Sequence, residues 1–118
     1  MGLGETMGNR IDMALALREL GVKSVPVNLL NPIKGTPYEN NKILSDDEFC
    51  RIVSIFRFLI PDGVIRLAGG RGLLGDKGEK CFRSGANAAI SGDMLTTAGI
   101  TARTVMALTN RLGYAVRL

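Results

Sequence analysis

The run from Val64 to Arg71 constrains the fold of this chain more than any other stretch. It reads Val-Ile-Arg-Leu-Ala-Gly-Gly-Arg, so an apolar segment carries one arginine in its middle and then opens into glycines. A strand of a parallel sheet is covered on both faces and is apolar almost throughout. Arg66 breaks that pattern, and a guanidinium is costly to bury without an anion beside it. The residue therefore needs either a salt bridge at the rim of a sheet or an anionic ligand.

The segments around this strand alternate between helical and extended patterns. Strands are expected over residues 24–29, 63–68 and 87–91, and helices over 9–20, 45–60, a short segment that ends near 84–85, and 101–112. Helices that connect successive strands imply right-handed crossovers and a parallel sheet. Gly2 to Glu5 has the glycines of a turn that follows a strand. That strand would be a fourth one, cut off before the turn. The order predicts part of a barrel rather than a complete fold.

Two local signals refine these boundaries. Pro26 lacks the N–H that a sheet needs, so we expect it at the start of its strand or at a bulge. The sequence Ser45-Asp46-Asp47-Glu48 predicts a capping box, in which the serine accepts from the backbone and Glu48 reaches back to it. The apolar residues after it recur at helical spacing until Pro61 ends the helix.

The composition excludes several classes of function. Histidine is absent, which removes the usual general base and the usual zinc ligand. The 15 basic and 11 acidic residues are dispersed, and aromatic residues are few, so nucleic-acid binding is not expected. No apolar run approaches the roughly 20 residues of a membrane span, and the first residues do not resemble a signal peptide. We expect a cytoplasmic protein that does not bind membranes.

Cys50 and Cys81 are the two cysteines of the chain. They fall on separate predicted helices without the Cys-x-x-Cys spacing of a metal or redox motif. We expect free, buried or half-buried thiols in a reducing compartment rather than a disulfide or a metal site.

The glycines from Gly70 to Gly75 have a second interpretation. They match the Gly-x-Gly-x-x-Gly pattern of dinucleotide-binding folds, they follow a strand, and Asp93 lies at a suitable distance to hold a ribose. Against this, the preceding strand carries Arg66, and the helix that follows is short, polar and interrupted by Gly78. A small dinucleotide-binding α/β module is therefore the alternative function.

Six motifs, in order along nearly the whole chain, resemble those of the biotin synthase family. They are Gly2–Thr6, Ser24–Asn28, Asn31–Pro37, Ile65–Arg71, Gly85–Asn87 and Gly92–Thr97. Six motifs in sequence are far more specific than any one of them. The family is a radical SAM (β/α)8 barrel, so the resemblance implies an α/β fold that is a partial TIM barrel, with about three parallel strands and helices on the outer face. Residues 1–118 would be its C-terminal segment, truncated at the N-terminus.

The resemblance also implies a reaction and its cofactors. In the family, S-adenosylmethionine is cleaved reductively at a 4Fe-4S cluster, the resulting deoxyadenosyl radical removes hydrogen from dethiobiotin, and a 2Fe-2S cluster donates the sulfur that forms biotin. Arg66 matches an arginine that is a ligand of the 2Fe-2S cluster. Gly2, Leu3, Gly4 and Glu5 match the end of a motif that lies along the adenosine part of the cofactor.

Three further residues match substrate contacts of the family. Asn28 corresponds to an asparagine that hydrogen-bonds the substrate, and a primary amide, which is both donor and acceptor, suits a ureido ring. The alternative for Asn28 is an ordinary asparagine that satisfies backbone groups at the end of a strand. Thr96 and Thr97 correspond to hydroxyls near the carboxylate tail of dethiobiotin. We expect Asn28, Arg66 and Thr96 to cluster at the carboxyl ends of the strands.

The departures from the family pattern limit what the chain can do alone. The Cys-x-x-x-Cys-x-x-Cys run that holds the 4Fe-4S cluster is absent, and so are the three cysteines that share the 2Fe-2S cluster with the arginine. We therefore expect a fragment that is inactive by itself, whose partners are dethiobiotin and the missing N-terminal half of the barrel, and which forms a homodimer when complete. Open sheet edges predict marginal stability, dye binding and a tendency to associate.

Overall fold

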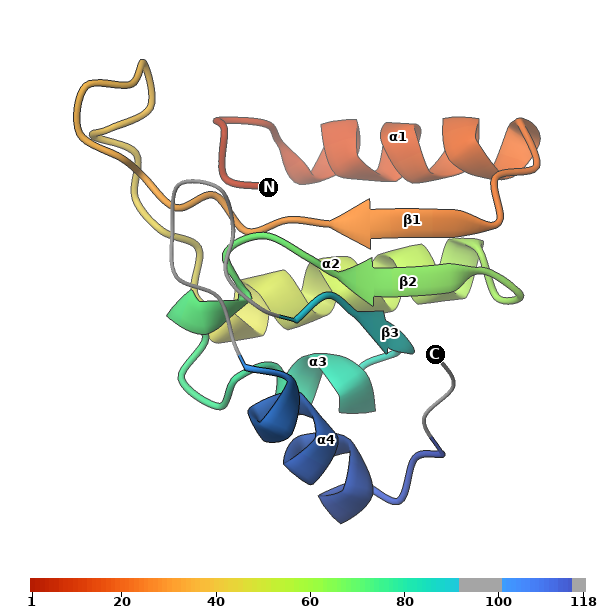
Figure 1. Cartoon of the computed structure of the whole chain (residues 1–118). Coiled ribbons are helices and arrows are strands. Elements are labelled where there is room, and N and C mark those ends of the chain that lie inside the picture. Colours follow the sequence, from red (N-terminus) through yellow and green to blue (C-terminus); the bar gives the residue numbers. More distant parts are fainter. Residues whose placement is uncertain (92–100, 116–118) are drawn as a thin grey trace.

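A parallel sheet of three strands forms the centre of the molecule. The computed structural model describes residues 1–91 and 101–115. Its strands are β1 (Ser24–Val27), β2 (Val64–Leu67) and β3 (Ala88–Ala89), adjacent in that order and parallel throughout (Figure 1). The three expected parallel strands are confirmed, although each is shorter than the sequence predicts.

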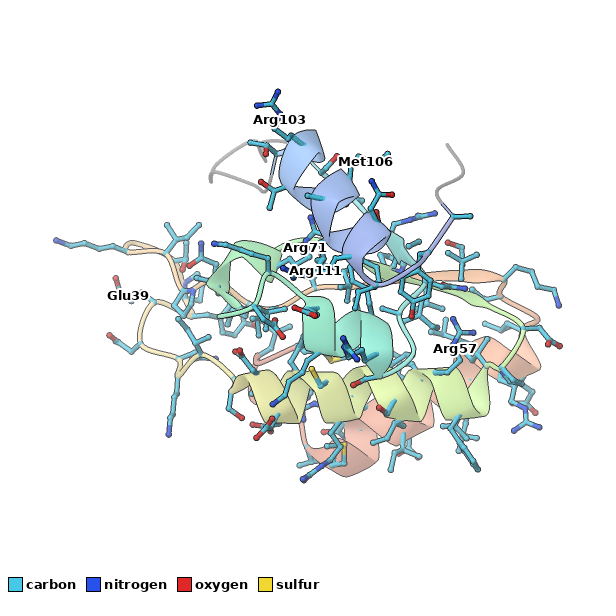
Figure 2. The ribbon with its side chains drawn as sticks, turned by 90° about the horizontal axis from the view of Figure 1, so that it is seen from below. Glu39, Arg57, Arg71, Arg103, Met106 and Arg111 are labelled. Carbon is cyan, nitrogen blue, oxygen red and sulfur yellow. The ribbon has the colours of Figure 1, made fainter. Side chains whose placement is uncertain are left out.

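Helices alternate with these strands along the chain. They are α1 (Met7–Glu19), α2 (Asp46–Leu59), the 3-10 turn η1 (Arg71–Leu73), α3 (Glu79–Arg83) and α4 (Ala102–Arg111). Helices α1 and α2 pack side by side on one face of the sheet, and α4 lies beside α3 beyond β3 (Figures 1 and 2). The α/β class, with three parallel strands and helices, is therefore as expected. No helix in the described ranges is long and apolar enough to cross a membrane.

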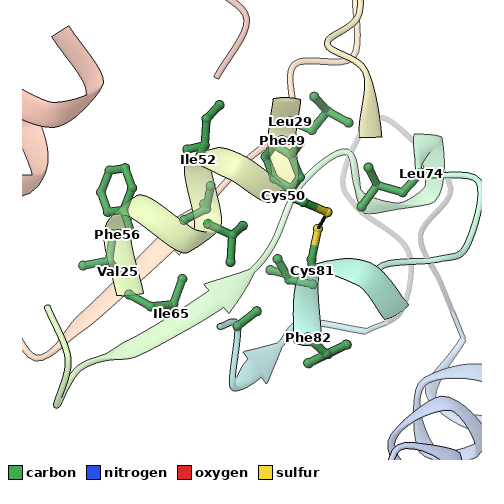
Figure 3. Packing of buried hydrophobic residues seen from close by; sticks show 14 of the residues in the cluster. Val25, Leu29, Phe49, Cys50, Ile52, Phe56, Ile65, Leu74, Cys81 and Phe82 are labelled. Carbon is green, nitrogen blue, oxygen red and sulfur yellow. Dashed lines mark hydrogen bonds between the residues drawn. The ribbon is translucent and has the colours of Figure 1, made fainter. Parts of the chain in front are cut away.

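The core lies between α2 and the sheet. Ile65 and Leu67 of β2 are fully buried, as are Phe49, Ile52 and Val53 on the facing side of α2 (Figure 3). The three residues of α2 are buried together because residues three and four positions apart lie on the same face of a helix. Pairs of Val25 with Ile65 and Val27 with Leu67 extend the same apolar layer across β1.

Pro26 lies inside β1 rather than at its start or at a bulge, so that expectation was wrong. The N–H of Val64 donates to the carbonyl of Lys23 (2.7 Å), and that of Ala68 donates to Val27 (3.2 Å). The backbone N–H and C=O groups of odd-numbered residues in β1 therefore point toward β2. The backbone of Pro26 points toward the opposite, open edge of the sheet. A proline is tolerated there because the missing N–H would have no partner in β2.

The helix caps also differ in part from the prediction. The Ser45 hydroxyl accepts from the N–H of Glu48 (3.2 Å), but the reciprocal half of the capping box is not formed. The carboxylate of Glu48 instead pairs with buried Arg10 at 3.3 Å. A complete capping box occurs at α1, where Thr6 and Asn9 exchange side-chain bonds with each other's backbone N–H.

The motif Gly85–Asn87 holds the amino ends of β2 and β3. The side chain of Asn87 accepts from the N–H of Ile65 (2.9 Å). Arg57, at the end of α2, donates to the carbonyls of Gly85 and Gly63 at 2.8 Å. A Cβ at Gly85 would lie 2.6 Å from the Cβ of Arg57, and the φ of Gly85 is +129°, so glycine is required there.

Two phenylalanines of α2 give a matched test of this core. Phe56 is 1% exposed, whereas Phe58 is 84% exposed. We expect Phe56→Ala to lower the free energy of unfolding by about 3–5 kcal/mol, because it removes buried surface and leaves a cavity. Phe58→Ala should change it by less than about 0.5 kcal/mol. Urea unfolding followed by circular dichroism measures both, and equal losses in the two variants would contradict the packing of α2 against the sheet.

Candidate functional site

Arg66 lies on the face of the sheet away from α1 and α2. Side chains of a strand alternate between faces, so the burial of Ile65 and Leu67 against the helices turns Arg66 to the other side. Its side chain is half-buried, and its register partners are Pro26 of β1 and Ala88 of β3. Among residues 1–91 and 101–115 its guanidinium makes no hydrogen bond or ion pair. The expected salt bridge is therefore not formed within these residues.

Asn28 follows β1 and joins its carboxyl end to that of β2. The side-chain oxygen accepts from the N–H of Gly69 at 2.7 Å, and the N–H of Leu29 donates to the carbonyl of Gly69 at 2.8 Å. Asn28 thus satisfies a backbone group, as the simpler interpretation of the sequence predicts. The residue is nevertheless exposed, and its amide N–H₂ makes no hydrogen bond to the described residues. One oxygen holds the strands together while two donors stay accessible.

The turn from Gly2 to Glu5 lies at the same end of the sheet. The N-terminal ammonium of Met1 donates to the carbonyl of Asn28 (2.7 Å), and the N–H of Leu30 donates to the carbonyl of Met1 (2.9 Å). Met1 thus bonds to the residues on both sides of Leu29, which is the hydrogen-bond pattern of two parallel strands. Met1 therefore extends the sheet beyond β1, and this pairing brings the glycine turn beside Asn28.

Glu5 closes this turn on itself. One carboxylate oxygen accepts from the N–H groups of Gly2 (2.6 Å) and Leu3 (3.2 Å), and the other accepts from Arg10 (2.9 Å). Burial by itself would raise the pKa of Glu5, but the Arg10 guanidinium and the two backbone donors outweigh it and hold the pKa below its ordinary value. The carboxylate is charged at neutral pH and fixes the backbone of the turn.

The glycines after β2 do not form a dinucleotide site. Gly70 has φ +80°, and a Cβ on it would lie 1.9 Å from the carbonyl oxygen of Leu29, so glycine is needed for the close approach to β1. The run then enters the three-residue turn η1, and the next helix, α3, has five residues. A pyrophosphate site needs a helix N-terminus directly after the glycines. This alternative function has no support in the fold.

Thr96, Thr97 and Asp93 lie outside the described residues, so the expected contact of Thr96 with the other two site residues stays a prediction. Asn28 and Arg66 do come from the carboxyl-terminal parts of neighbouring strands: Arg66 pairs with Pro26, two residues before Asn28, and Gly69, three residues after Arg66, bonds to the Asn28 side chain. In folds of alternating strands and helices, ligands bind at this end of the sheet.

Comparison with known proteins then identifies the family. Residues 26–115 match the family model "Biotin and Thiamin Synthesis associated domain", which is three quarters of the chain. The chain belongs to this family. The match covers the second half of β1 and all of β2 and β3, and with them Asn28 and Arg66.

Three curated relatives of the chain are named biotin synthase or biotin synthase 2. The chain is 60% identical to biotin synthase of Brachyspira hyodysenteriae over 118 residues, which are all of this chain and 35% of the relative. It is 60% identical to biotin synthase of Clostridium botulinum over 116 residues, 98% of the chain and 36% of the relative. It is also 60% identical over 118 residues to biotin synthase 2 of Corynebacterium diphtheriae. The predicted resemblance is confirmed, and the chain spans about a third of the length of these relatives.

Two buried arginines of the chain were missed in the sequence analysis. Arg10 is 4% exposed and pairs with Glu5 and Glu48, although its Nε makes no hydrogen bond to the described residues. Arg71 follows Gly70 and is equally buried, and none of its three guanidinium nitrogens has a partner in the described part of the chain (Figure 2). Burial lowers the pKa of Arg71. No periodic pattern separates these residues from the exposed arginines of the chain.

The two cysteines are free and buried, as expected, but they are not separate. Their sulfur atoms lie 3.2 Å apart between α2 and α3. They are on the helix-covered side of the sheet, away from Arg66. Within the described ranges, no three Cys, His, Asp or Glu residues form a group that could hold a metal ion.

The Glu5–Arg10 pair predicts a pH-dependent stability. Glu5→Gln should lower the free energy of unfolding by about 2 kcal/mol at pH 7, because it leaves buried Arg10 with one partner. The folded-state pKa lies below the unfolded value of about 4.3, so the contribution is complete above that pH and is lost as the pH falls through the folded pKa. The difference between variant and parent should therefore shrink below about pH 4.

Glu19→Gln is the matched control for this experiment. Glu19 is exposed at the end of α1 and makes no ion pair with the described residues, so its variant should unfold like the parent at every pH. Urea unfolding between pH 7 and pH 3 measures the three proteins. A Glu5→Gln effect that grows as the pH falls would contradict the proposed role of the carboxylate.

Proposed function

We propose that the chain is the C-terminal segment of a radical SAM (β/α)8 barrel and contributes to a biotin synthase, which converts dethiobiotin to biotin by inserting sulfur. The observation that carries the proposal is identity of 60% along the whole chain to enzymes of that name. The parallel sheet with α1 and α2 on one face is what such a segment of a barrel would form. The same match supports taking residues 1–118 together as that segment.

The open edge of β1 supports a missing part of the barrel. The backbone N–H and C=O groups of Ser24 and Asn28 point away from β2. The hydrogen bonds of Met1 already continue the sheet in that direction. A strand upstream of Met1 would complete the ladder. Because closed barrels have no free edge, we infer that the partner of this segment is the N-terminal half of the same barrel.

Arg66 is the residue through which this segment would hold the 2Fe-2S cluster. Its guanidinium is half-buried, has no partner among the described residues, and faces the side of the sheet that a barrel encloses, which suits an anionic group. Cys50 and Cys81 do not suit it, because they are buried on the other side and contact each other. Cysteines outside this chain would supply the other ligands of this cluster and those of the 4Fe-4S cluster. The clusters, with S-adenosylmethionine, would supply the electron, the radical and the sulfur.

The chain's own polar residues would bind and orient the small molecules. The free amide N–H₂ of Asn28 can donate to the carbonyl of the ureido ring of dethiobiotin while its oxygen keeps the strands joined. Gly2, Leu3, Gly4 and Glu5 would line the adenosine part of S-adenosylmethionine, with Glu5 fixing the turn. Thr96 and Thr97 would donate to the carboxylate tail. The complete enzyme would be a cytoplasmic homodimer.

A fused protein tests this function. We expect a chain that joins the upstream part of Brachyspira hyodysenteriae biotin synthase to residues 1–118 to form biotin from dethiobiotin, since it combines both halves of the barrel. The isolated chain, given iron, sulfide and S-adenosylmethionine, should form none because it lacks the cluster cysteines. The intact relative is the positive control. A folded, cluster-loaded fusion without product, or turnover by the isolated chain, would contradict the proposal.

The same fusion tests Arg66. Arg66→Met and Arg66→Lys should shift the visible absorption bands of the 2Fe-2S cluster, because a ligand changes. Arg103→Met is the matched control: Arg103 is exposed on α4, and its replacement should leave the spectrum unchanged. Identical spectra in all variants would show that Arg66 is not a ligand.

A further inference from the structure

Cys50 and Cys81 form a pair of thiols that the proposed reaction does not use. They lie 31 positions apart in the sequence, yet their Sγ atoms are 3.2 Å apart (Figure 3). Cys50 is 8% exposed and Cys81 is fully buried. Burial raises the pKa of Cys81, an effect that the adjacent Cys50 reinforces, so its thiol stays protonated at neutral pH.

Two polar contacts beside the thiols hold α2 and α3 in this position. A carboxylate oxygen of Asp46 accepts from the N–H of Gly75 at 3.0 Å, and Lys80 pairs with Asp47 at 2.6 Å. Asp46 and Asp47 lie in the first turn of α2, about one turn before Cys50, whereas Gly75 precedes α3 and Lys80 lies within α3 next to Cys81. Buried Leu74 packs in the same cluster. The approach of the sulfurs is therefore part of a defined contact between two elements.

We propose that Cys50 and Cys81 are an oxidation site, at which hydrogen peroxide converts the two thiols into a disulfide that links α2 to α3. The Cys50 thiol gives up its proton and its sulfur attacks one peroxide oxygen; the O–O bond breaks, Cys50 becomes a sulfenic acid, and the released hydroxide takes up the proton as water. The Cys81 sulfur then attacks the Cys50 sulfur, the S–O bond breaks, and the leaving hydroxide takes up the Cys81 proton as a second water. Two thiols and one peroxide thus give one disulfide and two waters, with the sulfurs oxidised by two electrons and the peroxide reduced by two.

The exposure of the two residues sets their roles. Peroxide is small enough to reach Cys50, the one sulfur-bearing side chain of the pair with any exposed surface, and Cys81 behind it resolves the sulfenic acid. A disulfide needs the sulfurs at about 2.05 Å, so they must approach by roughly another ångström. The product closes a loop that contains β2, Arg66 and the glycine run, and it would fix the strand that carries Arg66 against α2.

Mass spectrometry of the chain after treatment with hydrogen peroxide tests the site. We expect a monomer that has lost two hydrogen atoms, a peptide pair joined through Cys50 and Cys81, and full recovery of both thiols with dithiothreitol. Cys81→Ser should instead accumulate Cys50 sulfenic acid that dimedone traps. Cys50→Ser should keep its remaining thiol free for longer, because Cys81 is shielded. Monomer with both thiols unchanged, disulfides only between chains, or Cys50 oxidised further without a link would overturn the proposal.

A redox equilibrium gives a second test that needs no variant. In a buffer of reduced and oxidised glutathione, the equilibrium constant for the intrachain disulfide should be at least about tenfold larger in buffer than in concentrated urea, because the fold holds the thiols together. An equal or smaller constant in buffer would show that the native arrangement does not favour the link, and would also overturn the proposal.

Discussion

The alternation of side chains along β2 decides how the rest of the chain is arranged. Four residues place Ile65 and Leu67 toward α2 and leave Val64 and Arg66 on the other face. A shift of one residue would bury a guanidinium in the helix interface and expose the apolar pair, so the register is strongly fixed. The apolar side chains anchor the helix layer, and the same register presents Arg66 to the face that a complete barrel would enclose.

Hydrogen bonds beyond the ends of the two short strands join the carboxyl ends of β1 and β2. Asn28 and Leu29 both bond to Gly69, and Gly70 allows the chain to approach the carbonyl of Leu29. Gly70, the first glycine of the run that resembles a nucleotide-binding motif, therefore serves close backbone contact between neighbouring strands. This explains how one exposed asparagine can have a structural role and keep two donors for a ligand.

Much of the fold could be predicted because its signals are local and periodic. The apolar spacing of α2, the lone arginine of β2 and the order of strands and helices led to a parallel sheet with helices on one face. Contacts between distant residues had no such signal. The Arg10–Glu48 pair removed half of a capping box, and the position of Pro26 depended on which strand lay beside it. The contact of Cys50 with Cys81 depends on how α2 and α3 pack, which sequence spacing does not reveal.

The central claim is that the open edge of β1 receives the remainder of a biotin synthase barrel. Amide hydrogen exchange at Ser24 and Asn28 measures it most directly, since their N–H groups point away from β2, whereas those of Val25 and Val27 face it. We expect exchange at Ser24 and Asn28 to be at least about tenfold slower in the fused protein than in the isolated chain, because paired backbone exchanges only on opening. Unchanged exchange at these two amides, in a fusion where Val25 and Val27 are protected, would contradict the claim.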